Sequence, residues 1–272
     1  MINEEKIPFI EHLSELRDRL VRCSIAVGIG FCIAYFFKEK LFEILIAPLA
    51  HAMGENKNTQ MIFTGLPEAF FTYLKVSLMA GIVLSTPVLF YEFWMFISPG
   101  LYRTEKKYFL PIVVFSVLFF FLGAAFGYFI AFPYGFRFFL EFSTDTIHAM
   151  LSIREYLSFA SALLLAFGFV FELPLVLSFM ARMGLVTVPF LQKNRKYAVL
   201  IIFIAAAILT PGPDVISQII MAGPLMILYE IGIVGARIFG KKSDMDRATD
   251  TKEDAREDKG KNTVNNNFGD YI

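Results

Sequence analysis

The clearest pattern along the chain is a series of long apolar runs separated by short polar segments. A helix of about 20 apolar residues is long enough to cross the roughly 30 Å hydrocarbon core of a bilayer. Runs that approach or exceed this length with few charges cover residues 21–37, 70–97, 109–132, 157–183, 197–209 and 215–239. The pattern predicts an all-α, polytopic membrane protein with six transmembrane helices.

The fifth run is shorter than the others. Its 13 residues would cover only about 20 Å as a helix. It ends at Thr210-Pro211-Gly212-Pro213-Asp214, and a Pro-Gly-Pro sequence cannot continue a helix. We therefore expect the fifth and sixth helices to be short or to form a tight hairpin.

Composition supports this class and divides the chain in two. Apolar residues make up 56% of the sequence and the mean hydropathy is +0.59, more than a soluble domain of this length buries easily. After Gly240 the residues become polar and charged. We predict a transmembrane domain over residues 1–240 and a disordered cytoplasmic tail over residues 241–272.

The distribution of Lys and Arg predicts the orientation of the helices. If the N-terminus is cytoplasmic, 19 of the 25 basic residues fall in cytoplasmic segments. Cytoplasmic loops of membrane proteins carry such an excess. Both termini are therefore expected in the cytoplasm.

Two amphipathic segments flank the first run. Residues 9–20 place Leu13, Leu16 and Leu20 on one helical face and charges on the other, which predicts a helix on the membrane surface. Arg17 lies at the edge of the apolar stripe, where it would either reach lipid phosphates or pair with a carboxylate of the protein. Residues 41–53, interrupted by Pro48, are expected to form an external interfacial segment.

The sequence contains no recognisable catalytic or metal-binding motif. Its three His residues are scattered over different segments, so we expect no enzyme activity, metal or cofactor. The candidate functional groups are instead carboxylates within or beside the apolar runs, namely Glu15, Glu105, Glu172, Asp214 and Glu230.

Five motifs stand in order along residues 9 to about 240: EHLSELRDRL at 11–20, APL at 47–49, FISPGLYRTEKK at 96–107, FELP at 171–174 and TPGPDVISQ at 210–218. Together they resemble the TatC family, the receptor subunits of the twin-arginine protein translocase. Only the tail lies outside this resemblance. Ser98 and Gly100 stand where small apolar residues are also common in the family.

The resemblance implies a six-helix receptor in the cell inner membrane that binds signal peptides carrying two adjacent arginines. Single-span partner subunits of the TatA and TatB type would assist it in moving folded proteins across the membrane, driven by the proton gradient. The resemblance also implies a homo-oligomer within the receptor complex, contact with the lipid bilayer, and no nucleic-acid partner.

The resemblance assigns residues to two sites. Carboxylates suit twin-arginine peptides because an arginine–carboxylate pair can be bidentate, whereas a lysine offers a point charge. The signal-peptide site would comprise Glu15, Arg17, Phe96, Arg103 and Glu105. A second group, for docking of a partner helix or as intramembrane polar residues, would comprise Glu172, Asp214 and Pro48.

Each of these residues also has a purely structural interpretation. Glu15 can pair with Arg19 one helical turn away, and Glu105 can be a first-turn acid behind a Thr104 cap. Asp214 can cap a helix, and Phe96 can pack at the membrane edge.

Glu172 lies near the middle of the fourth run, where an ionised side chain facing lipid costs at least a few kcal/mol. It should therefore face protein or water. Pro174 leaves the Val170 carbonyl without its helical donor, which adds a second polar group. We expect a single-span partner to dock there, with Glu172 protonated or hydrogen-bonded; the alternative is a bond to another helix of this chain.

Two other classes of protein fit the pattern less well. A small-solute secondary transporter or channel would explain Glu172, but paired central charges and symmetric broken helices are not found in the sequence. An intramembrane hydrolase would lack its nucleophile and base.

Overall fold

The computed structural model of the chain describes residues 6–53, 61–62, 65, 67–97, 109–140, 151–209 and 215–240. Helices hold nearly all of these residues. A single parallel pairing, of β1 (Met61–Ile62) with β2 (Leu151–Ser152), is the only sheet among them. The predicted all-α class is confirmed, whereas the tail and the turn at 210–214 lie outside the described residues.

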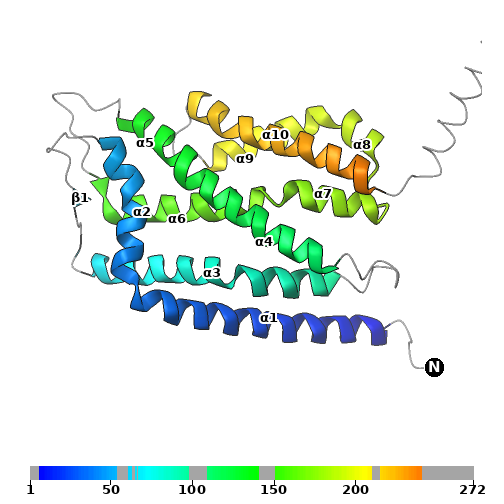
Figure 1. Cartoon of the computed structure of the whole chain (residues 1–272), viewed down its shortest axis with the longest axis horizontal. Helices are drawn as coiled ribbons and strands as arrows, with labels where there is room; N and C mark the ends of the chain where they lie inside the picture. Colours follow the sequence, from blue (N-terminus) through cyan, green and yellow to red (C-terminus); the bar gives the residue numbers. More distant parts are fainter. Residues whose placement is uncertain are drawn as a thin grey trace, which may run out of the picture.

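The first two long helices, α1 (Lys6–Phe36) and α3 (Glu68–Ile97), run antiparallel and side by side (Figure 1). The prediction of a separate surface helix over residues 9–20 is wrong, because α1 continues unbroken from Lys6 through the first span. No proline or glycine between Phe9 and Val27 interrupts the helix.

Glycine allows the close approach of α1 to α3. A Cβ added at Gly30 would lie 2.6 Å from the Gly81 carbonyl oxygen and 2.7 Å from Ser85 Oγ, and one added at Gly81 would lie 2.6 Å from the Phe31 nitrogen. Ser85 Oγ also donates to the Ala26 carbonyl at 2.8 Å. The two backbones are therefore in contact where these helices cross.

A helix that lies across one end of the bundle, α2 (Lys38–Met53), links α1 to the strand β1 (Figure 1). A continuous helical rod then crosses the bundle diagonally, formed by α4 (Phe109–Phe126), a π-helical turn at Gly127–Ala131, and α5 (Phe132–Leu140). The predicted third run, 109–132, thus continues beyond its expected end.

The fourth run, 157–183, was expected as a single span, but it is interrupted next to Pro174. α6 (Ile153–Val170) stops, Phe171 and Glu172 form a turn, and α7 (Leu173–Arg182) resumes with Pro174 in its first turn. A proline is tolerated there because the first helical N–H groups have no intrahelical acceptor. The interruption places Glu172 at the junction of two helices.

The remaining helices are α8 (Val188–Lys193), α9 (Arg195–Leu209) and α10 (Val215–Phe239), and α10 packs against both α7 and α9. Among the described residues, five helical stretches are long and apolar enough to cross a membrane. The 15-residue α9 would cover about 22 Å, in line with the predicted short fifth helix. The total of six spans stays a prediction.

Candidate functional site

An apolar groove of about 520 Å³ lies between α1, α3 and the α6–α7 junction. Its polar lining groups include one guanidinium and two carboxylates, those of Arg19, Glu92 and Glu172. The rest of the lining is dominated by aliphatic and aromatic side chains, including Leu16, Leu20, Phe90, Phe96, Phe169 and Val176. The groove thus combines a large apolar surface with a few fixed charges.

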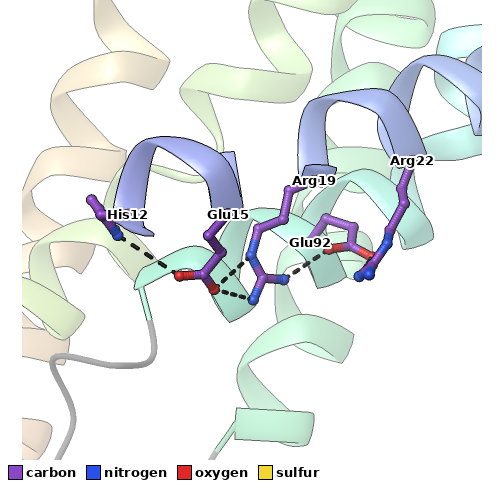
Figure 2. A network of polar contacts seen from close by, with 5 residues as sticks. All are labelled: His12, Glu15, Arg19, Arg22 and Glu92. Atoms are coloured by element: carbon purple, nitrogen blue, oxygen red, sulfur yellow. Dashed lines mark hydrogen bonds and ion pairs between the residues drawn. The ribbon is translucent and has the colours of Figure 1, made fainter. Parts of the chain in front are cut away.

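Arg19 joins two carboxylates from different helices (Figure 2). Its Nε donates to Glu15 Oε1 at 3.0 Å, and its Nη2 donates to the same oxygen. Its Nη1 donates to Glu92 Oε2 on α3 at 2.8 Å. Arg22 Nη1 lies 3.4 Å from the other Glu92 oxygen. We call Glu15, Arg19, Arg22 and Glu92 the charged cluster.

The charged cluster is partly shielded from solvent. The side chains of Glu92 and Arg19 are 8% and 14% exposed, whereas that of Glu15 is 34% exposed. Two carboxylates face two guanidinium groups, so the formal charges balance. Hydrogen bonds between ionised partners are stronger than neutral ones, and this shielding preserves more of that strength than a fully exposed pair retains.

His12 brings Phe96 next to the charged cluster. The two rings stack with centroids 4.4 Å apart and an interplanar angle of 15°, and His12 Nδ1 lies 3.8 Å from Glu15 Oε2. The structure therefore brings together two residues of the proposed signal-peptide site, Glu15 and Phe96. The alternative pairing of Glu15 with Arg19 is also present.

Arg17 points away from this cluster. Its side chain is 74% exposed, and its Nε and Nη2 donate to Asp18 Oδ1 at 3.0 and 2.9 Å. The carboxylate that Arg17 meets therefore belongs to the adjacent residue of α1 and not to another helix. The other two predicted site residues, Arg103 and Glu105, lie outside the described residues.

Glu172 is buried, with 6% of its surface exposed. One of its neighbours is Ser116 of α4, which also accepts a hydrogen bond from Trp94 Nε1 at 2.7 Å. Among the described residues, no donor reaches Glu172 Oε1. The side chain is thus shielded within the protein, as its position predicts, and retains one oxygen for a further donor.

Pro48 holds α2 against the rest of this chain. Proline at position 48 cannot donate to the Ile44 carbonyl one turn earlier, and that carbonyl accepts the Tyr128 hydroxyl at 2.7 Å. The next carbonyl, Leu45, accepts the Tyr156 hydroxyl at 2.6 Å. Pro48 itself is buried within this chain, and its proposed part in partner docking stays a prediction. Asp214 lies outside the described residues.

Sequence reasoning missed Glu92. It is the only acidic residue within the apolar run 70–97, and a lone carboxylate in a span is a signal that could have found it. Glu230, which was singled out, forms an exposed ion pair with Arg195 at 2.8 Å. Within the described part of the chain, no group of three potential metal ligands exists.

The fold and the groove define a polytopic helical membrane protein. Its charged cluster lies at the end of the bundle where α1 begins and where α3 and α10 end (Figure 1). The family model for the Sec-independent protein translocase protein (TatC) matches residues 11–224. This chain belongs to the TatC family and is therefore a component of the Sec-independent protein translocation system.

Relatives match along most of the chain. A TatC protein of Desulforapulum autotrophicum is 72% identical over 243 residues, which cover 89% of each chain. The TatC protein of Escherichia coli K12 is 37% identical over 236 residues, covering 87% of this chain and 90% of that one. A crystal structure of the twin-arginine translocase receptor TatC is 40% identical, with a TM-score of 0.74, and covers 84% of this chain and 98% of that one.

Proposed function

We propose that this protein is the membrane receptor that binds twin-arginine signal peptides for export of folded proteins. The peptide would lie across the N-terminal part of α1 and the C-terminal end of α3. Its two arginines would meet Glu15 and Glu105, with Phe96, Arg17 and Arg103 around them. The proposal extends to this chain the receptor role named for the similar crystal structure.

One observation carries the proposal: carboxylates lie beside an apolar groove. Glu15 is partly exposed in the N-terminal part of α1, and Leu16, Leu20 and Phe96 line the adjoining groove. A peptide in which paired guanidinium groups precede an apolar segment complements this arrangement, because acids can bind the arginines while the groove covers the apolar residues.

The protein would act with single-span partner subunits and use the proton gradient. Glu172 supports a docking role, since this residue lines the groove and its buried Oε1 has no hydrogen-bond partner among the described residues. A polar side chain of a partner helix could donate to this carboxyl group after it turns toward the groove. A second copy of this chain in the receptor complex is part of the same proposal.

The binding test uses cross-linking of a twin-arginine peptide to the full-length protein in membranes. Glu15→Gln and Glu105→Gln should each reduce cross-linking severalfold, because the amide keeps the shape but loses the charge that strengthens the bond to a guanidinium. Replacing the two peptide arginines by lysines should cause a similar loss.

Glu230→Gln is the matched control, since it removes an exposed, ion-paired carboxylate on α10 and should leave cross-linking unchanged. Normal cross-linking by the Glu15 and Glu105 variants would exclude these acids from the site and leave their structural interpretations.

The proposed location is the inner membrane with both termini in the cytoplasm. Single cysteines at positions 57 and 148 should react with a membrane-impermeant thiol reagent added outside, because the charge bias places these segments there. Cysteines at 104, 192 and 245 should react only after the membrane is opened. Reaction from outside at 104 would contradict the proposed orientation.

A further inference from the structure

The charged cluster already contains its own pair of guanidinium groups. Arg19 and Arg22 lie three residues apart on α1, and both contact Glu92 of α3. Arg19 also places two donors on Glu15. A peptide that brings two further guanidinium groups would therefore meet acids whose charges are already balanced.

Glu92 cannot serve a peptide while this arrangement holds. One of its oxygens accepts from Arg19 and the other faces Arg22, and its side chain is only 8% exposed. Glu15 is more accessible, but its Oε1 accepts both Arg19 donors. For a peptide to use these acids fully, Arg19 has to leave them.

We propose that Arg19 and Arg22 are an internal ligand of the peptide site, and that Glu92 is a further acceptor for a peptide arginine. Binding exchanges Arg19 for a peptide guanidinium at Glu92 and Glu15. This inference rests on the proposed receptor function and adds a residue and a source of specificity to it.

The exchange discriminates arginine from lysine. A peptide arginine restores the fork of N–H donors that Arg19 withdraws, so the hydrogen bonds lost and gained are alike. A peptide lysine supplies a compact ammonium that cannot reproduce contacts on two carboxylates in the same geometry. The internal ligand thus lowers the affinity for a lysine peptide more than the affinity for an arginine peptide, and this difference in affinity is the specificity.

The alternative is that the charged cluster only anchors α1 to α3. Those helices have a separate anchor about three turns away, where Gly30 contacts Gly81 and Ser85 bonds to the Ala26 carbonyl. That contact does not depend on Arg19. Arg19 can therefore leave its carboxylates while the two helices stay packed.

The test measures affinity of the purified full-length protein, in lipid nanodiscs, for two labelled signal peptides that differ only in an Arg-Arg or Lys-Lys pair. Arg19→Gln should raise affinity for the Lys-Lys peptide about tenfold and for the Arg-Arg peptide about threefold, so the preference for arginine falls. Glu92→Gln should lower affinity for the Arg-Arg peptide about threefold to tenfold.

Arg195→Gln removes a guanidinium from the exposed pair with Glu230 and should change neither affinity. If Arg19→Gln does not fold, Arg19→Lys provides the test. Lysine keeps the positive charge but lacks the guanidinium fork, so it binds Glu15 and Glu92 more weakly, and a reduced preference for the Arg-Arg peptide is again expected. Thermal unfolding of each variant checks its fold.

An unchanged preference for arginine in the folded Arg19 variant, or full affinity in Glu92→Gln, would overturn the inference while leaving the receptor function intact. Failure of the unaltered protein to prefer the Arg-Arg peptide would overturn the proposed function and this inference with it.

Discussion

Glu92 and Glu172 line the same groove, and each residue, backbone included, is 6% exposed, yet their surroundings differ. Both Glu92 oxygens face guanidinium groups of α1. Glu172 has the Ser116 hydroxyl as a neighbour, and its Oε1 has no hydrogen-bond partner among the described residues. Each oxygen of Glu92 thus has a guanidinium partner, whereas one oxygen of Glu172 has no partner among the described residues.

The difference indicates separate roles for the two acids. A buried charge is stable when it is paired and hydrogen-bonded, and an unsatisfied polar group is costly. Glu92 therefore needs nothing from outside the chain, and a ligand reaches it only by exchange. Glu172 gains from any donor that a partner brings, because its bonding is incomplete. Peptide binding and partner docking are thus expected to respond to different mutations.

The largest effect is expected where the helices that carry Glu92 and Arg19 meet. In Gly30→Ala the new methyl group would overlap the Gly81 carbonyl oxygen and Ser85, forcing α1 away from α3 at a cost of about 1–3 kcal/mol. Peptide binding should fall because Glu15 on α1 and Glu92 on α3, the two proposed acceptors, move apart. Thermal unfolding and peptide affinity of the purified protein measure the two effects.

Gly28→Ala is the matched control for this variant. A Cβ at Gly28 would meet nothing within 4 Å, so this change should be neutral or slightly stabilising, since alanine favours helices. Equal unfolding temperatures for the two variants would show that α1 and α3 are not in close contact at Gly30.

The same two glycines show what the sequence can and cannot predict. The apolar runs predicted the long helices and the class of protein. Pro174 predicted a free Val170 carbonyl, but the run 157–183 was expected as one span and is broken at Phe171 and Glu172. Gly28 and Gly30 look alike in the sequence because both lie in an apolar run. Only the crossing with α3 distinguishes them, and a contact between segments about 50 residues apart leaves no periodic signal.

The orientation of α1 was hidden for a related reason. In water, the apolar face of a helix packs inward, but in a membrane protein apolar side chains can also face lipid. Here Leu13 and Leu20 are 49% and 64% exposed, whereas Arg19 turns toward α3. The periodicity separated apolar from charged positions. It could not show that Arg19 turns toward α3 while Leu16 and Leu20 line the adjoining groove, so the pairing of Arg19 with Glu92 was missed.

An effect of intermediate size is expected at Glu172. Glu172→Ala should reduce cross-linking of a single-span partner along α7, and export of a folded reporter, about tenfold, because an interhelical hydrogen bond contributes about 1–2 kcal/mol. Glu172→Gln keeps an acceptor and should be milder. Peptide capture should stay nearly normal in both variants.

Glu92→Gln provides the opposite pattern, with reduced peptide capture and normal partner cross-linking. The pair of variants thus separates the two roles within one groove. Loss of both activities in Glu172→Ala, or loss of its fold, would make Glu172 a structural residue and remove the distinction.

The smallest effect is expected at Ser116, which is completely buried and accepts the Trp94 N–H while neighbouring Glu172. Ser116→Ala leaves the Trp94 donor without this acceptor, at a cost of about 1–2 kcal/mol in thermal unfolding. It also leaves the Glu172 carboxyl free to turn, so partner cross-linking should fall about threefold.

Ser161→Ala is the control, since that hydroxyl is also buried but has no hydrogen-bond partner among the described residues, and its loss should change neither measurement. If both serine variants behave alike, Ser116 does not orient Glu172, and the docking proposal would rest on the carboxyl group alone.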